Sequence, residues 1–157
     1  MSVQQILKPV GNLDKNKTVV LCVGSRLKGD DAAGCIVCDL LKGRMNIEVI
    51  DAGIVPENFI GQIIKKTPQN VIIIDAVDFS APAGSVKLFD PSQAESFSIS
   101  THSVSLKLLC DCIGSETICR FFLIGIQPAQ TDFNSSLSAE AQAAAEAVAD
   151  ELIKIFG

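Results

Sequence analysis

Long apolar runs and a secretion signal are both missing from this sequence. Its uninterrupted apolar runs, such as residues 71–74 and 121–124, fall far short of the roughly 20 residues that a membrane helix requires. The N-terminus has no basic region followed by an apolar stretch of signal-peptide length. We therefore expect a soluble, cytoplasmic protein without a membrane partner.

The sequence also lacks a block or stripe of basic residues. It has 13 lysines and arginines, which are scattered, against 18 aspartates and glutamates, so its formal net charge is -5. Proteins that bind nucleic acid concentrate basic residues on one face, where they contact the phosphates. A nucleic-acid partner is therefore not expected.

Low-complexity tracts are absent as well, and the composition is that of a globular chain. Hydrophobic residues make up 48% and charged residues 20% of the 157 residues, which is enough apolar material for a core. A chain of this length folds as one unit. We expect a single domain over residues 1–157, in which residues 1–17 form a peripheral lead-in and regular structure starts at Thr18.

The six cysteines occur without the short length and secretion signal that accompany a disulfide framework. We expect reduced thiols, most of them small residues of the core. Cys35 and Cys38 fall within one expected helix, and the side chains of Cys110 and Cys112 point to different sides. A zinc or iron–sulfur site on these thiols is an alternative that stoichiometric metal in the purified protein would support.

Apolar patterns along the chain predict alternating strands and helices. Continuous apolar runs predict buried strands at residues 18–23, 47–51, 71–74, 85–89 and 118–126. Apolar residues at helical spacing predict helices at residues 33–41, 55–66, 103–113 and from 138 onward. The turn at residues 81–84 is too short for a crossover helix, so the strand after it should run antiparallel. This order predicts a three-layer α/β/α fold with a mostly parallel, twisted, five-stranded sheet and one antiparallel strand.

Ligands of such sheets bind beyond the carboxyl ends of the parallel strands. The candidate segments there are residues 24–31 with two adjacent aspartates, residues 75–78 with Asp75 and Asp78, and residues 101–103 with His102, the one histidine of the chain. The stretch 90–101 lacks periodicity and is long for a connection, which makes it a further candidate for function.

The glycine-rich turn has the spacing of a phosphate-binding loop but not its chemistry. Gly24 and Gly29 are separated like the glycines of G-x-x-x-x-G-K-[ST], whereas Asp30 and Asp31 stand where that motif has lysine and a hydroxyl residue. Their negative charge would repel phosphate. Nucleotide binding is therefore not expected.

Each acidic candidate, taken alone, is most simply a helix cap or a turn residue, and a lone histidine at a helix start is most simply structural. The topology, however, brings the turn aspartates, Asp75 and His102 to one rim of the sheet. Two carboxylates and one imidazole suit a divalent transition metal and leave coordination positions open. The set is too small for a tightly held structural zinc, so we expect a shared or transient metal. Asp78 and Glu57 are further candidates that serve equally well as turn and helix-start residues.

Several motifs gain specificity when they are considered together, because their order and spacing are more specific than any one of them. They lie at residues 23–31, 51–53, 56–58, 74–78, 101–103 and 125–128. Together they resemble the hydrogenase maturation protease family, especially the branch that processes the large subunit of hydrogenase 3. The likeness runs from near Thr18 to the C-terminus. Ser25 and Ala32 depart from the family's turn, which commonly has asparagine and glycine at these positions.

The resemblance implies a phosphorylase/hydrolase-like fold and an aspartic-type endopeptidase. Members of this family remove a C-terminal extension from the large-subunit precursor of [NiFe]-hydrogenase after nickel insertion. Nickel would arrive with the precursor and would not be tightly bound by the free enzyme. By motif position, the nickel-contacting and catalytic residues correspond to Asp31, Asp75 and His102.

Two other functions remain open on the sequence. The chain could be a non-catalytic nickel-handling or assembly factor on the same fold, which binds the precursor without cutting it. It could also be a related peptidase that acts on other proteins. A serine or cysteine nucleophile with a partnered base is not evident, because the only imidazole is already assigned to the metal-ligand set.

Overall fold

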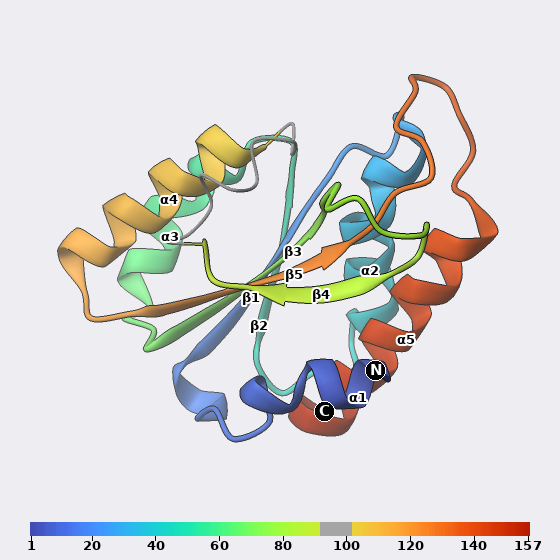
Figure 1. The fold of residues 1–157 in the computed structure, drawn as a ribbon. Helices are drawn as coiled ribbons and strands as arrows, with labels where there is room; N and C mark the ends of the chain where they lie inside the picture. The colour runs from blue at the N-terminus through green and yellow to red at the C-terminus, as the bar shows by residue number, and fades with distance from the viewer. Residues whose placement is uncertain (92–101) are drawn as a thin grey trace.

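The computed structural model describes residues 1–91 and 102–157, which form a layered α/β fold (Figure 1). Its five strands are β1 (Thr18–Val23), β2 (Glu48–Gly53), β3 (Asn70–Ala76), β4 (Val86–Phe89) and β5 (Arg120–Ile126). They lie in the order β2-β1-β3-β5-β4. Four strands are parallel, and β4 alone pairs antiparallel, with β5. The predicted fold class is confirmed.

Helices cover both faces of the sheet. One face carries α2 (Ala33–Leu41) and α5 (Ala139–Phe156), and the other carries α3 (Ile60–Lys65) and α4 (Ser103–Glu116) (Figure 1). Successive residues of β1 alternate between the two cores, with Val20 packed in the core of α2 and α5 and Leu21 in that of α3 and α4. Every residue of β1 and β3 is buried as a result, which explains their continuous apolar runs.

The first seventeen residues form three short helical turns before β1. These are α1 (Val3–Ile6), η1 (Lys8–Val10) and η2 (Lys15–Lys17). Regular structure therefore begins before Thr18, which is where the sequence pattern predicted its start. Ser2 and Gln5 form a capping box that starts α1. Leu7 and Val10 are fully buried in the same core as α5, and the segment therefore contributes side chains to that core.

Some boundaries differ from those expected. The predicted second helix divides into a 3-10 turn, η4 (Pro56–Phe59), followed by α3, and α4 continues past Gly114. Thr101 and the rest of the segment 92–101, expected to be functional, lie outside the described residues. Within the described ranges, none of the helices combines the length and apolar character needed to cross a membrane.

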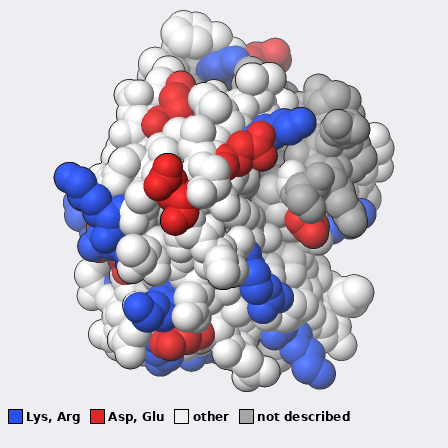
Figure 2. Space-filling model, turned by 90° about the vertical axis from the view of Figure 1, so that its left-hand side faces the viewer, with Lys and Arg blue, Asp and Glu red and all other residues white. Residues whose placement is uncertain are grey.

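Charged side chains of both signs are mixed on the face that α3 and α4 form. Lysine and arginine side chains lie beside aspartate and glutamate side chains across this view (Figure 2). The visible face therefore has the scattered charge distribution that the sequence indicates.

Candidate active site

The side chains of Asp31, Asp75 and His102 meet at the carboxyl edge of the parallel strands. Asp31 lies in η3 (Gly29–Ala32), the 3-10 turn after β1, Asp75 lies near the end of β3, and His102 is the N-cap residue of α4. The three residues are 2%, 0% and 7% exposed, respectively. One candidate ligand atom from each lies within 4.8 Å of the others. The predicted convergence of these residues is confirmed, and we call them the three-residue site.

The imidazole of His102 lies between the two carboxylates. Its Nδ1 is 3.3 Å from Asp75 Oδ2, and its Nε2 is 3.9 Å from Asp31 Oδ2. Asp75 Oδ1 accepts a hydrogen bond from the backbone N–H of Ala76 at 2.9 Å. Asp31 Oδ2 accepts one from the backbone N–H of Ser25 at 3.1 Å. Backbone donors thus orient both carboxylates toward the same ring.

Burial and charge act in opposite directions on His102. Removal from water lowers the pKa of the imidazole, whereas the hydrogen bond to Asp75 and the charges of Asp75 and Asp31 raise it. The net effect is a pKa above the ordinary 6.5. The ring therefore holds a proton more readily than a free histidine does, and a metal ion that binds it has to compete with that proton.

Two glycines permit the close approaches that build the site. A Cβ on Gly34, in α2, would lie 2.2 Å from the carbonyl oxygen of Val23 and 2.7 Å from that of Ile74. A Cβ on Gly24 would lie 2.2 Å from the carbonyl oxygen of Asp31. Because these positions carry no side chain, α2 starts directly against the ends of β1 and β3. This contact brings the turn after β1 to the end of β3.

Asp30 has a different role from its neighbour. Its buried carboxylate accepts hydrogen bonds from the backbone N–H of Ala129 at 2.7 Å, and from the backbone N–H and hydroxyl of Ser138 at 2.6 and 2.7 Å. Ser138 Oγ in turn accepts from the backbone N–H of Ala141 and caps α5. Asp30 therefore ties the turn after β1 to the start of α5, and Asp31 is the member of the pair that joins the three-residue site.

The two further candidates from the sequence do not belong to the three-residue site. Asp78 accepts hydrogen bonds from the backbone N–H of Ser80 and from Gln127 Nε2, which together hold the pKa of its carboxyl below its usual value. Gln127 Oε1 also binds backbone N–H groups between β3 and β4, so this pair fixes that turn. Glu57 lies in η4, and among the described residues its buried Oε2 has no hydrogen-bond partner.

Arg26 anchors the site turn, although sequence reasoning did not single it out. Its guanidinium binds both carboxylate oxygens of Asp39, in α2, at 2.7 and 2.9 Å, and Asp51 Oδ2, in β2, at 3.0 Å. The partners are 13 and 25 residues away, so no local motif could have revealed them. These contacts hold the turn after β1 to its neighbouring helix and strand.

The donors of the three-residue site suit a divalent transition metal that brings other ligands with it. Two carboxylates and one imidazole occupy only part of a coordination shell. In the described part of the chain the thiols form no comparable group of ligating atoms. All six cysteines are free, and three of them are buried in the core: Cys22, Cys35 and Cys38. The cysteine-based metal site is therefore not supported.

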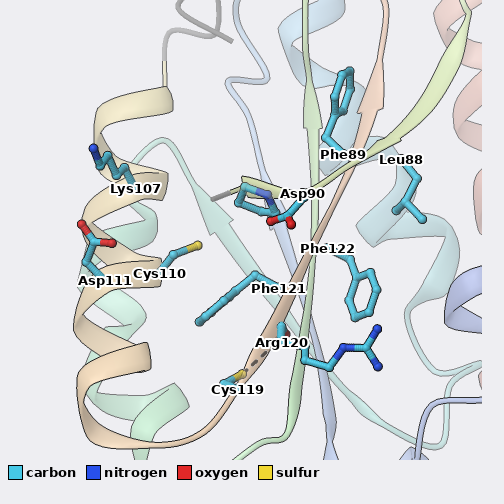
Figure 3. Close-up of a pocket in the computed structure, with 11 residues that line it drawn as sticks. Leu88, Phe89, Asp90, Lys107, Cys110, Asp111, Cys119, Arg120, Phe121 and Phe122 are labelled. Atoms are coloured by element: carbon cyan, nitrogen blue, oxygen red, sulfur yellow. Dashed lines mark hydrogen bonds between the residues drawn. The ribbon is translucent and has the colours of Figure 1, made fainter. Parts of the chain in front are cut away.

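A separate surface pocket of about 620 Å³ lies between α4 and the strands β4 and β5 (Figure 3). Lys107, Cys110 and Asp111 line it from α4, and Arg120 lines it from the first residue of β5. None of the residues of the three-residue site lines this pocket. Its place at the start of a parallel strand separates it from the carboxyl edge, where ligands of such sheets bind.

Sequence comparisons place the chain among known proteases. The family model described as hydrogenase maturation protease (HycI) matches residues 37–155. Hydrogenase 3 maturation protease of Escherichia coli is 34% identical over 137 residues, covering 85% of this chain and 87% of that protein. A putative hydrogenase maturation protease of Methanocaldococcus jannaschii is 30% identical over 150 residues, covering 89% of this chain and 88% of that protein.

Solved structures have the same architecture. The crystal structure of a [NiFe] hydrogenase maturation protease, HycI, from Thermococcus kodakarensis matches with a TM-score of 0.84 and 26% identity, covering 98% of this chain and 97% of that chain. The solution structure of the endopeptidase HycI from Escherichia coli matches with a TM-score of 0.78 and 33% identity, covering 88% of this chain and 90% of that chain. The chain therefore belongs to the hydrogenase maturation protease family and is a peptidase of that family.

Proposed function

We propose that this endopeptidase removes a C-terminal extension from the large-subunit precursor of a [NiFe]-hydrogenase after nickel insertion. The observation that carries the proposal is the buried group of Asp31, Asp75 and His102, with ligand atoms within 4.8 Å of one another. The family supports the class of substrate. A non-catalytic nickel-handling factor has less support, because the matching family model and relatives are described as proteases.

Nickel enters this scheme as part of the substrate. Thiolates of the precursor hold the ion and leave it able to accept further ligands. Asp31 and Asp75 offer carboxylate oxygen and His102 offers imidazole nitrogen, both of which bind divalent transition metals. A precursor without nickel lacks this link and binds weakly. The site therefore distinguishes precursor that is ready to be cut from precursor that is not.

Hydrolysis of the peptide bond requires a base for the attacking water and a route for its proton. A carboxylate of the three-residue site accepts a proton as the water oxygen bonds to the scissile carbonyl carbon. When the carbon–nitrogen bond breaks, the proton passes to the leaving amine. His102 orients the Asp75 carboxylate through Nδ1, which lies 3.3 Å from Asp75 Oδ2, and its Nε2 is the nitrogen offered to the metal. Substrate-borne nickel supplies Lewis-acid polarisation of the carbonyl.

The test compares nickel-loaded and nickel-free precursor incubated with the purified protein, and detects the released segment by mass spectrometry. We expect cleavage of the nickel-loaded precursor and little cleavage of the nickel-free form. His102→Ala should lower the cleavage rate by about 100-fold or more, because it removes a ligand and the group that orients the Asp75 carboxylate. Asp31→Asn and Asp75→Asn should act in the same direction.

Asp111→Asn provides the matched control, because Asp111 is an exposed carboxylate on α4 that lies outside the site. Its cleavage rate should equal that of the wild type, and circular dichroism checks that every variant is folded. Equal cleavage of both precursor forms would contradict nickel recognition. A wild-type rate in the folded His102→Ala variant would contradict the site assignment.

A further inference from the structure

Four large apolar side chains are exposed on the loops that follow three of the parallel strands. Leu27, after β1, is 59% exposed, and Phe133, after β5, is 64% exposed. Ile54 and Val55, after β2, are 59% and 38% exposed. We call these four residues the apolar rim. Because the three strands are parallel, the apolar rim lies at the same edge of the sheet as the three-residue site (Figure 1).

The residues of the apolar rim lie close together. Leu27, Ile54 and Val55 line one surface pocket of about 450 Å³. The backbone N–H of Asn134 donates a hydrogen bond of 2.7 Å to the carbonyl oxygen of Leu27, so the loop that carries Phe133 lies against the turn after β1. Single exposed apolar residues are ordinary, but adjoining ones at a functional edge are typical of an interaction surface.

The apolar rim borders the three-residue site. Ser25 lines the same pocket as Leu27, and its backbone N–H donates the hydrogen bond of 3.1 Å to Asp31 Oδ2. The three-residue site itself is almost completely buried. A protein segment that brings its scissile bond to this edge from the side of the turn after β1 therefore lies across the apolar rim.

The chemistry of the pocket favours an apolar partner over an anionic one. Arg26 is the cation among its lining residues, and its guanidinium is already bound to Asp39 and Asp51. Ala52 and Phe59 extend the apolar lining. An anion that bound Arg26 would have to displace its ion pairs with Asp39 and Asp51. An apolar side chain can be buried in the pocket while these ion pairs stay intact.

We propose that the apolar rim is the docking surface for the body of the precursor protein, next to the segment that is cut. This inference rests on the proposed function and adds the surface that holds the substrate. The occupant is an apolar, uncharged patch on a folded protein, because the apolar rim spans loops from three strands and so offers a broad surface. The three-residue site then engages the metal and the scissile bond, while the apolar rim supplies much of the affinity.

Substitution of rim residues by serine tests this proposal. Leu27→Ser, Ile54→Ser and Phe133→Ser are made singly and together, and Ile118→Ser serves as control because Ile118 is 96% exposed but lies before β5, at the other end of that strand. Kd for labelled nickel-loaded precursor is measured in an Asp75→Asn background, which prevents cleavage from depleting the complex, and each Kd is compared with that of Asp75→Asn alone because Asp75 is itself a proposed nickel ligand. Each single change should raise Kd about tenfold, and the triple change by about 100-fold or more. Ile118→Ser should leave Kd unchanged.

Processing kinetics with Asp75 intact provide the second readout. The rim variants should raise KM for the nickel-loaded precursor and leave kcat near that of the wild type, because the apolar rim does not touch the reacting atoms. Thermal melting shows that each variant is folded. An unchanged Kd in the folded triple variant overturns the proposal. The proposal is also overturned if the wild type forms a concentration-dependent dimer that the triple variant does not form, while both bind the precursor equally well, because the apolar rim is then an interface between two copies of this chain.

The outcomes separate this inference from the proposed function. If the wild type cleaves nickel-loaded precursor and the triple variant binds it equally well, the apolar rim is not the docking surface and the proposed function stands. If the wild type binds the precursor but does not cleave it, and the triple variant loses binding, the docking surface stands and the proposed function falls.

Discussion

Asp30 and Asp31 are neighbours in one 3-10 turn, yet their carboxylates have different surroundings. Both fit the pattern of acidic residues at a helix start, so local sequence alone did not separate them. The partners that do separate them are distant: Asp30 binds backbone groups 99 and 108 residues further along the chain. The resemblance selected Asp31 by motif position, and the geometry places that residue beside His102.

The protonation of His102 is the prediction that belongs to this scale. Because the chain has one histidine, its imidazole signals can be followed by NMR without overlap from another. In metal-free protein we expect a pKa above 6.5, since Asp75 and Asp31 outweigh the effect of burial. Asp75→Asn should lower this pKa. A wild-type value at or below 6.5 would show that burial dominates.

The same shift has a defined sign for stability. A pKa that is higher in the folded than in the unfolded state means that the imidazolium stabilises the fold, fully so below about pH 6.5. This contribution is lost as the pH rises through the folded-state pKa of His102. His102→Gln should remove that pH dependence from the free energy of unfolding, as measured by urea denaturation at a series of pH values.

Among the secondary-structure elements, the buried strands, the short antiparallel β4 and the final helix were predictable, whereas the 3-10 turns were not. The runs of β1 and β3, and the apolar stripe of α5 behind its Ser138 cap, carry strong local signals. The pattern at residues 55–66 indicated one helix, but the chain there begins with a 3-10 turn that has the same apolar spacing. Gly114 suggested a helix end, yet α4 continues to Glu116 and the backbone N–H of Thr117 still donates to the carbonyl oxygen of Ile113, because one glycine inside a helix costs only about 1 kcal/mol.

The connection between the site turn and α5 gives a prediction at this scale. Asp30→Asn would keep one oxygen acceptor but turn an NH2 group toward the donors that now bind the other oxygen, among the part-buried N–H groups of Ala129 and Ser138, and would remove the negative charge that both bonds use. We expect a loss of about 3 kcal/mol or more in the free energy of unfolding, measured by urea denaturation. Asp31→Asn, one residue away, should cost much less stability while it abolishes processing. Equal stability losses would contradict the separation of their roles.

For the whole molecule, the layered fold and the meeting of a turn aspartate with Asp75 and His102 followed from the order of elements along the chain and the carboxyl-edge rule, and the family resemblance selected Asp31 within the turn. The contribution of the first seventeen residues to the core could not be predicted in this way. Their helical turns are too short to show a period, and Leu7 and Val10 are buried because distant parts of the chain, α5 and β4, pack beside this segment. The Arg26 contacts were hidden for the same reason, since only tertiary structure brings the partners together.

Leu7 provides the prediction for the whole molecule. Leu7→Ala should lower the free energy of unfolding by about 2–5 kcal/mol, because a fully buried side chain is replaced by a cavity. Urea denaturation measures the change. Ile118→Ala is the matched control on an exposed residue and should stay within about 0.5 kcal/mol of the wild type. A small effect of Leu7→Ala would mean that the N-terminal turns are dispensable for the core.

The position of β3 between β1 and β5 bears on when the enzyme can first act. Asp75 lies on β3. Of the two strands beside it, β1 is synthesised before β3, and β5 is synthesised after the other four described strands. Until residue 126 has left the ribosome, the sheet beside Asp75 remains open on one side. A nascent chain shorter than this carries Asp31, Asp75 and His102 but lacks the strand that pairs with β3 beside Asp75.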